Sequence, residues 1–541
     1  MDRHRLRLSL RLSLRRTLSF AALAAVPAAV LAVFFVLPVG GMIARVDASG
    51  WALLGDDRTR RVVWFTVWMS TLATVVSVLL GTPCAYVTHR LRFPGRGLLR
   101  GLLLVPFVLP TVVVGVAIGR LMDNGALAIL LGLVFFNVSV VIRTVGVAWE
   151  SLDRRPAEAA AALGASPTRV FRTVTLPALR PALVSAAVVV FLFCATGFGV
   201  VLTLGGLRYS SVETEIYLLT TGGITGFPEL SAAAALSLVQ MVVVMVLLAV
   251  AARLRAVPDP TVRRLPASPA RPRLRDLPAL AVTAAVLVAL AVPLASLVLG
   301  SLRHDGRWTL AFYRSLQSDG GGLVRVPITE ALGNSLRIAV EASALSLTLG
   351  LLVAVVVTRR SRSVTERRVR AVFDGLFMVP LGVSAVTLGF GFLITLDHPP
   401  VDLRESPWLV PIAQALVAMP LVVRILVPVL AGLDDRQRQA AASLGASPLR
   451  AVLVVDVPAL WRPLLASAGF AFAVSLGEFG ATSFLVRPET PTLPVVIYRL
   501  VGSPGPLNYG AAMAASVILA ATAAAVVLVI ERLRVPGVGS L

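Results

Sequence analysis

The sequence contains no lysine, so all 50 of its basic residues are arginines. A Walker-type phosphate-binding loop needs a lysine after its glycines, so the chain carries no such site for ATP hydrolysis. Only two cysteines are present, Cys84 and Cys194, and both fall in apolar stretches, which argues against a disulfide or zinc framework. The four histidines are scattered, and no Ser/His/Asp or Cys/His arrangement is evident. We therefore expect no catalytic site, bound metal or cofactor in this chain.

Charged residues are also scarce, at 14% of the chain, whereas 57% of residues are hydrophobic and the mean hydropathy is +0.86. A helix that crosses a bilayer needs about 20 apolar residues. The sequence predicts an all-α polytopic membrane protein with about 12 transmembrane helices in two tandem six-helix halves; the short turn at Met122–Gly125 allows a count that differs by one. The first span has no small-residue cleavage site behind it and is expected to stay as an anchor. The predicted spans are 20–44, 62–88, 99–121, 126–148, 182–205, 231–252, 279–300, 331–357, 371–396, 408–430, 464–486 and 509–530.

The net charge of +22 is concentrated in a few arginine-rich segments. The N-terminal residues and the segments 89–100, 253–275 and 359–370 are rich in arginine, whereas 210–230 and 397–406 are poorer in it or mixed in sign. This pattern follows the positive-inside rule and predicts a cytoplasmic location for both termini of a multi-pass cell-membrane protein. An RNA-binding patch would need a soluble domain, and none is long enough. The arginines therefore indicate a lipid bilayer, and no nucleic acid, as the partner.

A short segment occurs once in each half of the chain. "EAAAALGASPTRVFRTVTLPALRP" (158–181) returns as "QAAASLGASPLRAVLVVDVPALWRP" (439–463), and Gly164 and Gly445 lie 281 residues apart. Nine of eleven positions are identical between 159–169 and 440–450. Internal repeats are common in transporters, and an even number of spans per half predicts parallel repeats with both segments on the cytoplasmic side.

The arginine- and proline-rich stretch between the halves is the natural domain boundary. It divides the chain into a cytoplasmic basic N-terminus (1–19), a first half (20–255) with its repeated loop at 150–181, a cytoplasmic linker (256–277), a second half (278–534) with its repeated loop at 432–463, and a C-terminal tail (535–541).

The repeated loop has the residues of a compact helix–turn–helix. Gly164 is expected to end a helix in the left-handed conformation, and Ser166-Pro167 to cap and start the next one, which Pro177 then ends. A face of alanine and glycine would let another protein approach closely, and a symmetric pair of such faces suits a symmetric partner. An ordinary interhelical loop is the alternative, but other loops of similar length do not repeat. The residues assigned to this partner-docking role are Glu158, Ala159, Ala160, Gly164, Ser166, Pro167 and Pro177, and in the second copy Gln439, Ala440, Ala441, Gly445, Ser447, Pro448 and Pro458.

"EAAAALGAS…LP" resembles the EAA motif of permease subunits from binding-protein-dependent ABC importers, and the resemblance covers nearly the whole chain. It implies a type I ABC importer fold in which each loop is a coupling helix that docks on an ATP-binding subunit. Two such subunits would hold ATP and Mg²⁺, and an extracytoplasmic solute-binding protein would deliver the cargo. The second copy departs from the motif, because Gln439 stands where the first has Glu158.

Fused double permeases of this length resemble the thiamine and ferric-iron permeases. The passages 198–221 and 474–503 are most similar to the thiamine branch, although "LGEFGAT" also resembles the usually unfused molybdate and sulfate permeases. The resemblance implies a thiamine or thiamine phosphate importer, with ferric iron as the alternative cargo.

Glu478 is the best candidate for a residue in the substrate path. Its numbering places it about 15 residues into the eleventh predicted span, and charges deep in a span are costly and commonly functional. A lone carboxylate suits a cationic cargo, whereas a helix cap or an interhelical hydrogen bond is the structural alternative.

An ion-coupled secondary transporter also uses two six-helix halves. That class needs several intramembrane acids or histidines, and it has no use for paired docking loops. We therefore favour the permease over this alternative.

Overall fold

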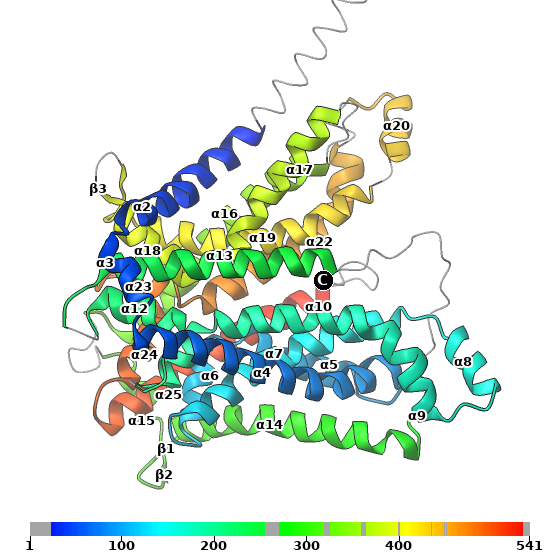
Figure 1. Cartoon of the computed structure of the whole chain (residues 1–541), viewed down its shortest axis with the longest axis horizontal. Coiled ribbons are helices and arrows are strands. Elements are labelled where there is room, and N and C mark those ends of the chain that lie inside the picture. The colour runs from blue at the N-terminus through cyan, green and yellow to red at the C-terminus, as the bar shows by residue number, and fades with distance from the viewer. Residues whose placement is uncertain are drawn as a thin grey trace, which may run out of the picture. The chain divides into compact units, whose positions relative to one another are not determined.

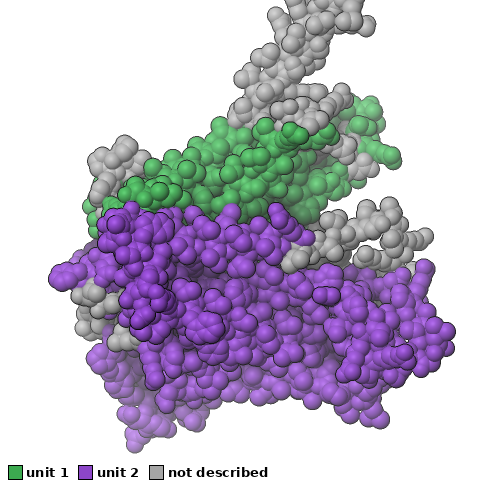
Figure 2. All heavy atoms as spheres, viewed as in Figure 1, with its two compact units in different colours: residues 1–45, 333–486, 525–541 green, residues 46–332, 487–524 purple. Residues whose placement is uncertain are grey.

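The computed structural model describes residues 23–206, 208–223, 226–254, 270–318, 325–358, 364–398, 401–433, 435–447, 450 and 452–533, which are helical apart from short loops and two small hairpins (Figure 1). The predicted N- and C-terminal tails, most of the 256–277 linker and Pro448 lie outside these residues. The described chain divides into two units (Figure 2): unit 1 contains residues 1–45, 333–486 and 525–541, and unit 2 contains residues 46–332 and 487–524.

Unit 2 is built mainly from the first half of the sequence. Its elements are α3 (Ala48–Leu53), α4 (Asp57–Arg90), α5 (Arg96–Leu104), η2 (Val105–Val108), α6 (Thr111–Gly119), α7 (Ala126–Glu150), α8 (Arg155–Ala162), α9 (Pro167–Val170), η3 (Phe171–Thr175), α10 (Leu176–Ala195), α11 (Phe198–Leu204), α12 (Val212–Thr221), α13 (Leu230–Leu254), η4 (Leu274–Asp276), α14 (Leu277–Ser301), α15 (Ala311–Ser315) and α24 (Leu493–Val501). Strands β1 (Arg303–His304) and β2 (Arg307–Trp308) form an antiparallel hairpin after α14.

Unit 1 is built mainly from the second half. It contains η1 (Ala32–Val36), α2 (Leu37–Arg45), α17 (Val364–Met378), η5 (Val379–Gly382), α18 (Ala385–Thr395), α19 (Leu409–Ala431), α20 (Asp435–Ser443), η6 (Val452–Asp456), α22 (Val457–Gly477) and α23 (Thr482–Leu485), and most of α16 (Ile328–Thr358). The antiparallel strands β3 (Asp397–His398) and β4 (Val401–Asp402) connect α18 to α19. The last helix, α25 (Pro506–Leu533), lies in unit 2 up to Ala524.

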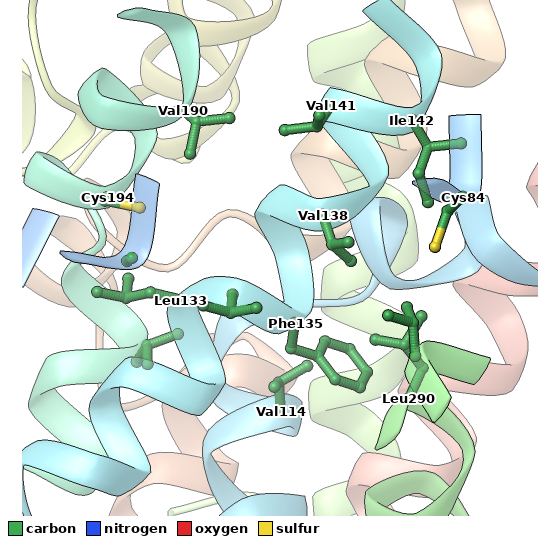
Figure 3. Close-up of a cluster of buried hydrophobic side chains, with 14 of the residues drawn as sticks. Cys84, Val114, Leu133, Phe135, Val138, Val141, Ile142, Val190, Cys194 and Leu290 are labelled. Atoms are coloured by element: carbon green, nitrogen blue, oxygen red, sulfur yellow. The ribbon is translucent and has the colours of Figure 1, made fainter. Parts of the chain in front are cut away.

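Each half contributes its first helix to the unit formed by the other half. The N-terminal helix packs on α18: the rings of Phe34 and Phe392 lie 5.8 Å apart, and the Arg45 guanidinium donates a 3.1 Å hydrogen bond to the Ile394 carbonyl. In unit 2, α14 packs against α4 and α6, and its Leu290 joins the buried cluster that includes Val114 and Phe135 (Figure 3). The tandem repeat in sequence is thus not two self-contained bundles in space.

The same buried cluster contains both cysteines. Cys84 is fully buried and Cys194 is 3% exposed, and both are free thiols among aliphatic side chains (Figure 3). This confirms that they serve as small apolar residues. Within the described residues, no group of three histidine, cysteine or acidic side chains could hold a metal ion.

The all-α polytopic fold is confirmed, but two of the expected spans are broken. Ten of the described helices are long and apolar enough to cross a membrane, or eleven if a pair bent by 98°, Arg96–Val108 and Thr111–Gly119, forms one span. This pair replaces the expected helix 99–121, because Pro106 and Pro110 lack the N–H groups that a continuous helix needs. The expected helix 371–396 is likewise interrupted, into α17, η5 and α18, at a turn that contains Pro380.

The bent pair nevertheless joins the two ends of unit 2. At its start, Arg96 donates hydrogen bonds to the Thr88 and His89 carbonyls, which lie at the C-terminal end of α4. At its other end, the six residues 120–125 connect α6 to α7, which begins at Ala126. In Figure 1, α5 lies towards the α8–α9 end of this unit and α6 towards the α12 end. Counted as one broken span, the pair gives the first half six crossings, an even number.

Candidate functional site

The first repeated loop connects α7 to α10 and contains α8 and α9, which lie at one end of unit 2 (Figure 1). No residue of α8 is buried. At its C-terminal end Gly164 has a φ of +84°, and the Ala165 N–H donates to the Ala160 carbonyl at 3.1 Å. The Gly164 N–H donates to the Ala161 carbonyl at 3.0 Å. This pair of bonds is a Schellman motif, which satisfies the last carbonyls of α8 and turns the chain sharply.

The turn is followed at once by a capped helix start. The Ser166 hydroxyl accepts a 3.4 Å hydrogen bond from the Arg169 N–H, and Pro167 is the first residue of α9, where its missing N–H costs nothing. The expected stop and restart of the first copy are therefore confirmed.

The second loop repeats this geometry in unit 1, between α19 and α22. Gly445 has a φ of +82°, and the Ala446 N–H donates to the Ala441 carbonyl at 3.0 Å. The Ser447 hydroxyl accepts a 3.3 Å bond from the Arg450 N–H, as Ser166 does from Arg169 in the first loop. The same local sequence thus gives the same turn in two separate units.

The expected helix end at Pro177 is wrong. Residues Pro167–Ala195 form one helix of 29 residues, with the π-helical turn η3 directly before α10. A π turn is wider than an α turn, so the helix continues although Pro177 cannot donate a backbone hydrogen bond. The second half has the π-helical turn η6 at the corresponding place, before Pro458. The first repeated loop is therefore joined to a long helix without a break.

Sequence reasoning missed the most exposed apolar side chains among the described residues of both loops. Leu163 and Leu444 are each 89% exposed, and each directly precedes the turn glycine. A single exposed leucine is common on protein surfaces, but the same leucine exposed beside the same turn in both loops fits a paired binding surface. The available signal was that this leucine is identical in both copies of a segment that lies outside the membrane spans.

The acidic residue that only the first loop has at this place in the motif, Glu158, lies on the surface. The Glu158 carboxylate is 3.6 Å from the Arg154 guanidinium, four residues earlier, and both side chains are largely exposed. Such a pair adds little to stability. Glu158 therefore remains available to a partner, as does the neutral Gln439 that replaces it in the exposed helix α20.

Glu478 does not lie in the middle of a span. Helix α22 ends at Gly477, and the Glu478 side chain turns back to the start of α23: its Oε1 accepts from the Ala481 N–H at 2.8 Å and its Oε2 from the Thr482 N–H at 3.0 Å. The Thr482 hydroxyl also donates to this carboxylate and accepts a 3.2 Å bond from the Gln414 amide. Glu478 is only 8% exposed. The carboxylate thus caps α23 in this structure.

The architecture is that of a membrane permease with the same exposed turn once in each half. A family model described as "Binding-protein-dependent transport system inner membrane component" matches residues 77–264 and 346–538, once in each half, and the chain belongs to this family. It is a transport subunit of a multi-pass inner-membrane ABC importer. Permeases of this kind act with an ATP-binding subunit and with a binding protein.

Curated relatives of similar length share the fused organisation. The chain is 28% identical over 474 residues to the thiamine transport system permease protein ThiP of Brucella abortus, an alignment that covers 83% of each chain. It is 27% identical over 478 residues to the protein of the same name from Escherichia coli, covering 84% of this chain and 85% of the other. A probable ABC transporter permease protein of Sinorhizobium fredii is 25% identical over 531 residues, 91% of each chain.

Proposed function

We propose that this chain is the permease of an ATP-driven importer of thiamine or thiamine phosphate, and that it works by alternating access between the two faces of the inner membrane. The pair of exposed, identically built loops is the observation that carries the ATP-driven mechanism, because a self-powered carrier needs no such pair. The names of the thiamine permease relatives support thiamine as the cargo. Ferric iron is the alternative cargo.

In this proposal two copies of an ATP-binding subunit, which carry the ATP and Mg²⁺, dock on the two loops from the cytoplasm, where both termini of the permease also lie. Closure of the two subunits on ATP moves the loops, and the long helices joined to them change which face of the membrane the pathway opens to. An extracytoplasmic binding protein supplies the cargo at the other face.

Growth and uptake assays test the cargo and the energy source separately. A strain that cannot make thiamine should grow on limiting thiamine only when this chain is present, and uptake in vesicles should need ATP. Unimpaired growth in its absence, together with a growth defect on limiting iron, would reassign the cargo to ferric iron. Uptake that follows a proton gradient without ATP would instead contradict the whole proposal.

We also propose that the Glu478 charge assists a cationic cargo, in addition to capping α23. The Glu478→Gln variant should lower thiamine uptake several-fold and leave basal ATP hydrolysis nearly unchanged, because a fixed negative charge stabilises a cation where the dielectric constant is low. Uptake and hydrolysis are measured in proteoliposomes that hold the complete complex.

A Thr482→Val variant is the control for the capping role. It removes one hydroxyl partner of the same carboxylate and keeps the charge. Normal uptake in Thr482→Val beside reduced uptake in Glu478→Gln would support the charge; equal reduction in both would assign Glu478 to capping alone.

A further inference from the structure

The first docking loop is connected to α7 by stacked aromatic rings. Phe171, in the π turn that follows the loop, stacks on Trp149 with ring centroids 6.3 Å apart and planes 29° apart. Trp149 is only 4% exposed and lies next to the last residue of α7. On its other side it meets Tyr86 of α4, with centroids 5.3 Å apart. The three rings thus form a continuous contact from the loop to α4.

The contact extends to the exchanged helix α14. The Tyr86 hydroxyl donates a 2.8 Å hydrogen bond to Asp276 Oδ1, and Asp276 directly precedes α14 and is 5% exposed. The other carboxylate oxygen accepts a 2.8 Å bond from the Arg273 N–H. Displacement of the Phe171 ring would therefore act on α7, α4 and the start of α14 together.

A group of charged side chains holds the same end of α7. The Glu150 carboxylate pairs with Arg96 at 3.2 Å and also with Arg100. Both guanidinium groups donate to the Thr88 carbonyl of α4, Arg96 at 2.6 Å and Arg100 at 2.8 Å. An exposed ion pair alone contributes little, but these side chains bridge three helices at fixed geometry. Trp149 consequently lies in a region where α4, α5 and α7 are fastened to one another.

The second half has no counterpart of the Trp149, Glu150 and Phe171 side chains at the positions related by the 281-residue offset. Leu430 replaces Trp149, Ala431 replaces Glu150 and Val452 replaces Phe171. The docking segments themselves are identical at nine of eleven positions. The two halves therefore differ in how each loop is attached to its helices. General divergence of the loops does not account for this difference, because the loops themselves are nearly identical.

We infer that the two docking loops drive the transmembrane helices unequally, and that Trp149 is a positioning residue that transmits movement of the first loop rigidly to α4 and α14. This inference rests on the proposed ATP-driven function. A buried aromatic ring has few rotamers and large contact area, so it passes on a displacement that smaller aliphatic side chains would absorb. The first loop is accordingly connected rigidly to its transmembrane helices, and the second loop is connected to its helices more flexibly.

Single substitutions at corresponding positions of the two halves test this inference. In proteoliposomes with the complete complex, Trp149→Leu should lower uptake per ATP hydrolysed by roughly three- to tenfold, the range expected for the loss of aromatic contacts. Trp149→Phe should restore most of the ratio. The matched control is Leu430→Ala in the second half, which should leave the ratio unchanged. Phe171→Val should add little to Trp149→Leu, because both changes interrupt the same contact.

A second measurement does not depend on the cargo. Spin labels at the exposed positions Thr168 and Arg271 report the distance between the first loop and the segment before α14. In the wild type this distance should be the same with and without ATP, whereas Trp149→Leu should shift or broaden it on ATP binding.

Three results would overturn the inference. The first is an ATP-dependent change of the Thr168–Arg271 distance in the wild type. The others are an equal loss of uptake per ATP hydrolysed in Leu430→Ala, or a parallel loss of hydrolysis and uptake in Trp149→Leu that leaves their ratio unchanged. A wild-type complex that neither binds an ATP-binding subunit nor responds to ATP would instead show that the proposed function has failed.

Discussion

Replacement of Leu163 and Leu444 by aspartate should release the ATP-binding subunits from the permease. Each leucine is 89% exposed in the isolated chain, and burial of a leucine in a partner's groove contributes about 1.5–3 kcal/mol. Because each loop docks its own subunit in the proposed function, loss of its leucine contact should weaken binding at that loop by about one to two orders of magnitude, and burial of a carboxylate would add to this. The affinity of purified permease for its ATP-binding subunit measures the effect directly.

The matched control for this double variant is Leu274→Asp. Leu274 is 85% exposed in η4, outside both loops, so its replacement changes the surface to a similar extent. Its variant should bind the ATP-binding subunit normally. If the loop double variant also binds normally, the loops are not the docking surface.

Replacement of Gly164 and Gly445 by aspartate should leave the permease in the membrane and abolish ATP-coupled uptake. Both glycines have a φ above +80°, where a side chain costs roughly 1 kcal/mol, and a Cβ at either position meets open space within this chain. The permease should therefore fold, and the loss should come from the distorted turn and from the added side chain at the partner's surface. Membrane content, ATP hydrolysis and uptake are measured together.

Gly226 supplies the control for backbone strain in this experiment. It has a φ of +83°, also faces open space, and lies in the turn between α12 and α13. Gly226→Asp should thus carry the same local penalty without uncoupling transport. Normal transport by the Gly164→Asp/Gly445→Asp double variant would contradict the docking role of the turns.

The turns could be predicted from sequence because their causes are local. A glycine after an alanine-rich helix and a Ser-Pro pair two residues later determine the Schellman turn and the cap, and the same residues give the same hydrogen bonds in both units. Proline was harder to interpret. Pro106 and Pro110 interrupt a span, whereas Pro177 is accommodated by a π turn, and the neighbouring sequence does not distinguish these outcomes.

Long-range features left no comparable local signal. The apolar pattern of α14 is that of any membrane helix, so nothing in it indicates that it packs against α4 and α6 of the other half. Glu478 was correctly recognised as an unusual acid, but its capping of α23 depends on the chain turning back after Gly477. The 281-residue offset already shows in sequence that Trp149 has no counterpart, but only the structure shows its contacts with Phe171 and Tyr86.

The exchange of first helices has a consequence for biosynthesis. The N-terminal helix belongs to unit 1, whose remaining described core begins at Gly333, so its packing partners have not been made when it enters the membrane. At about 5–20 residues per second, ribosomes need roughly 15–60 s to make the intervening chain. During that time the helix lies in the lipid without its packing partners, exposed to membrane proteases and to mispairing with other helices. The nascent N-terminal helix therefore needs protection during synthesis, because it is made well before the residues that it finally contacts.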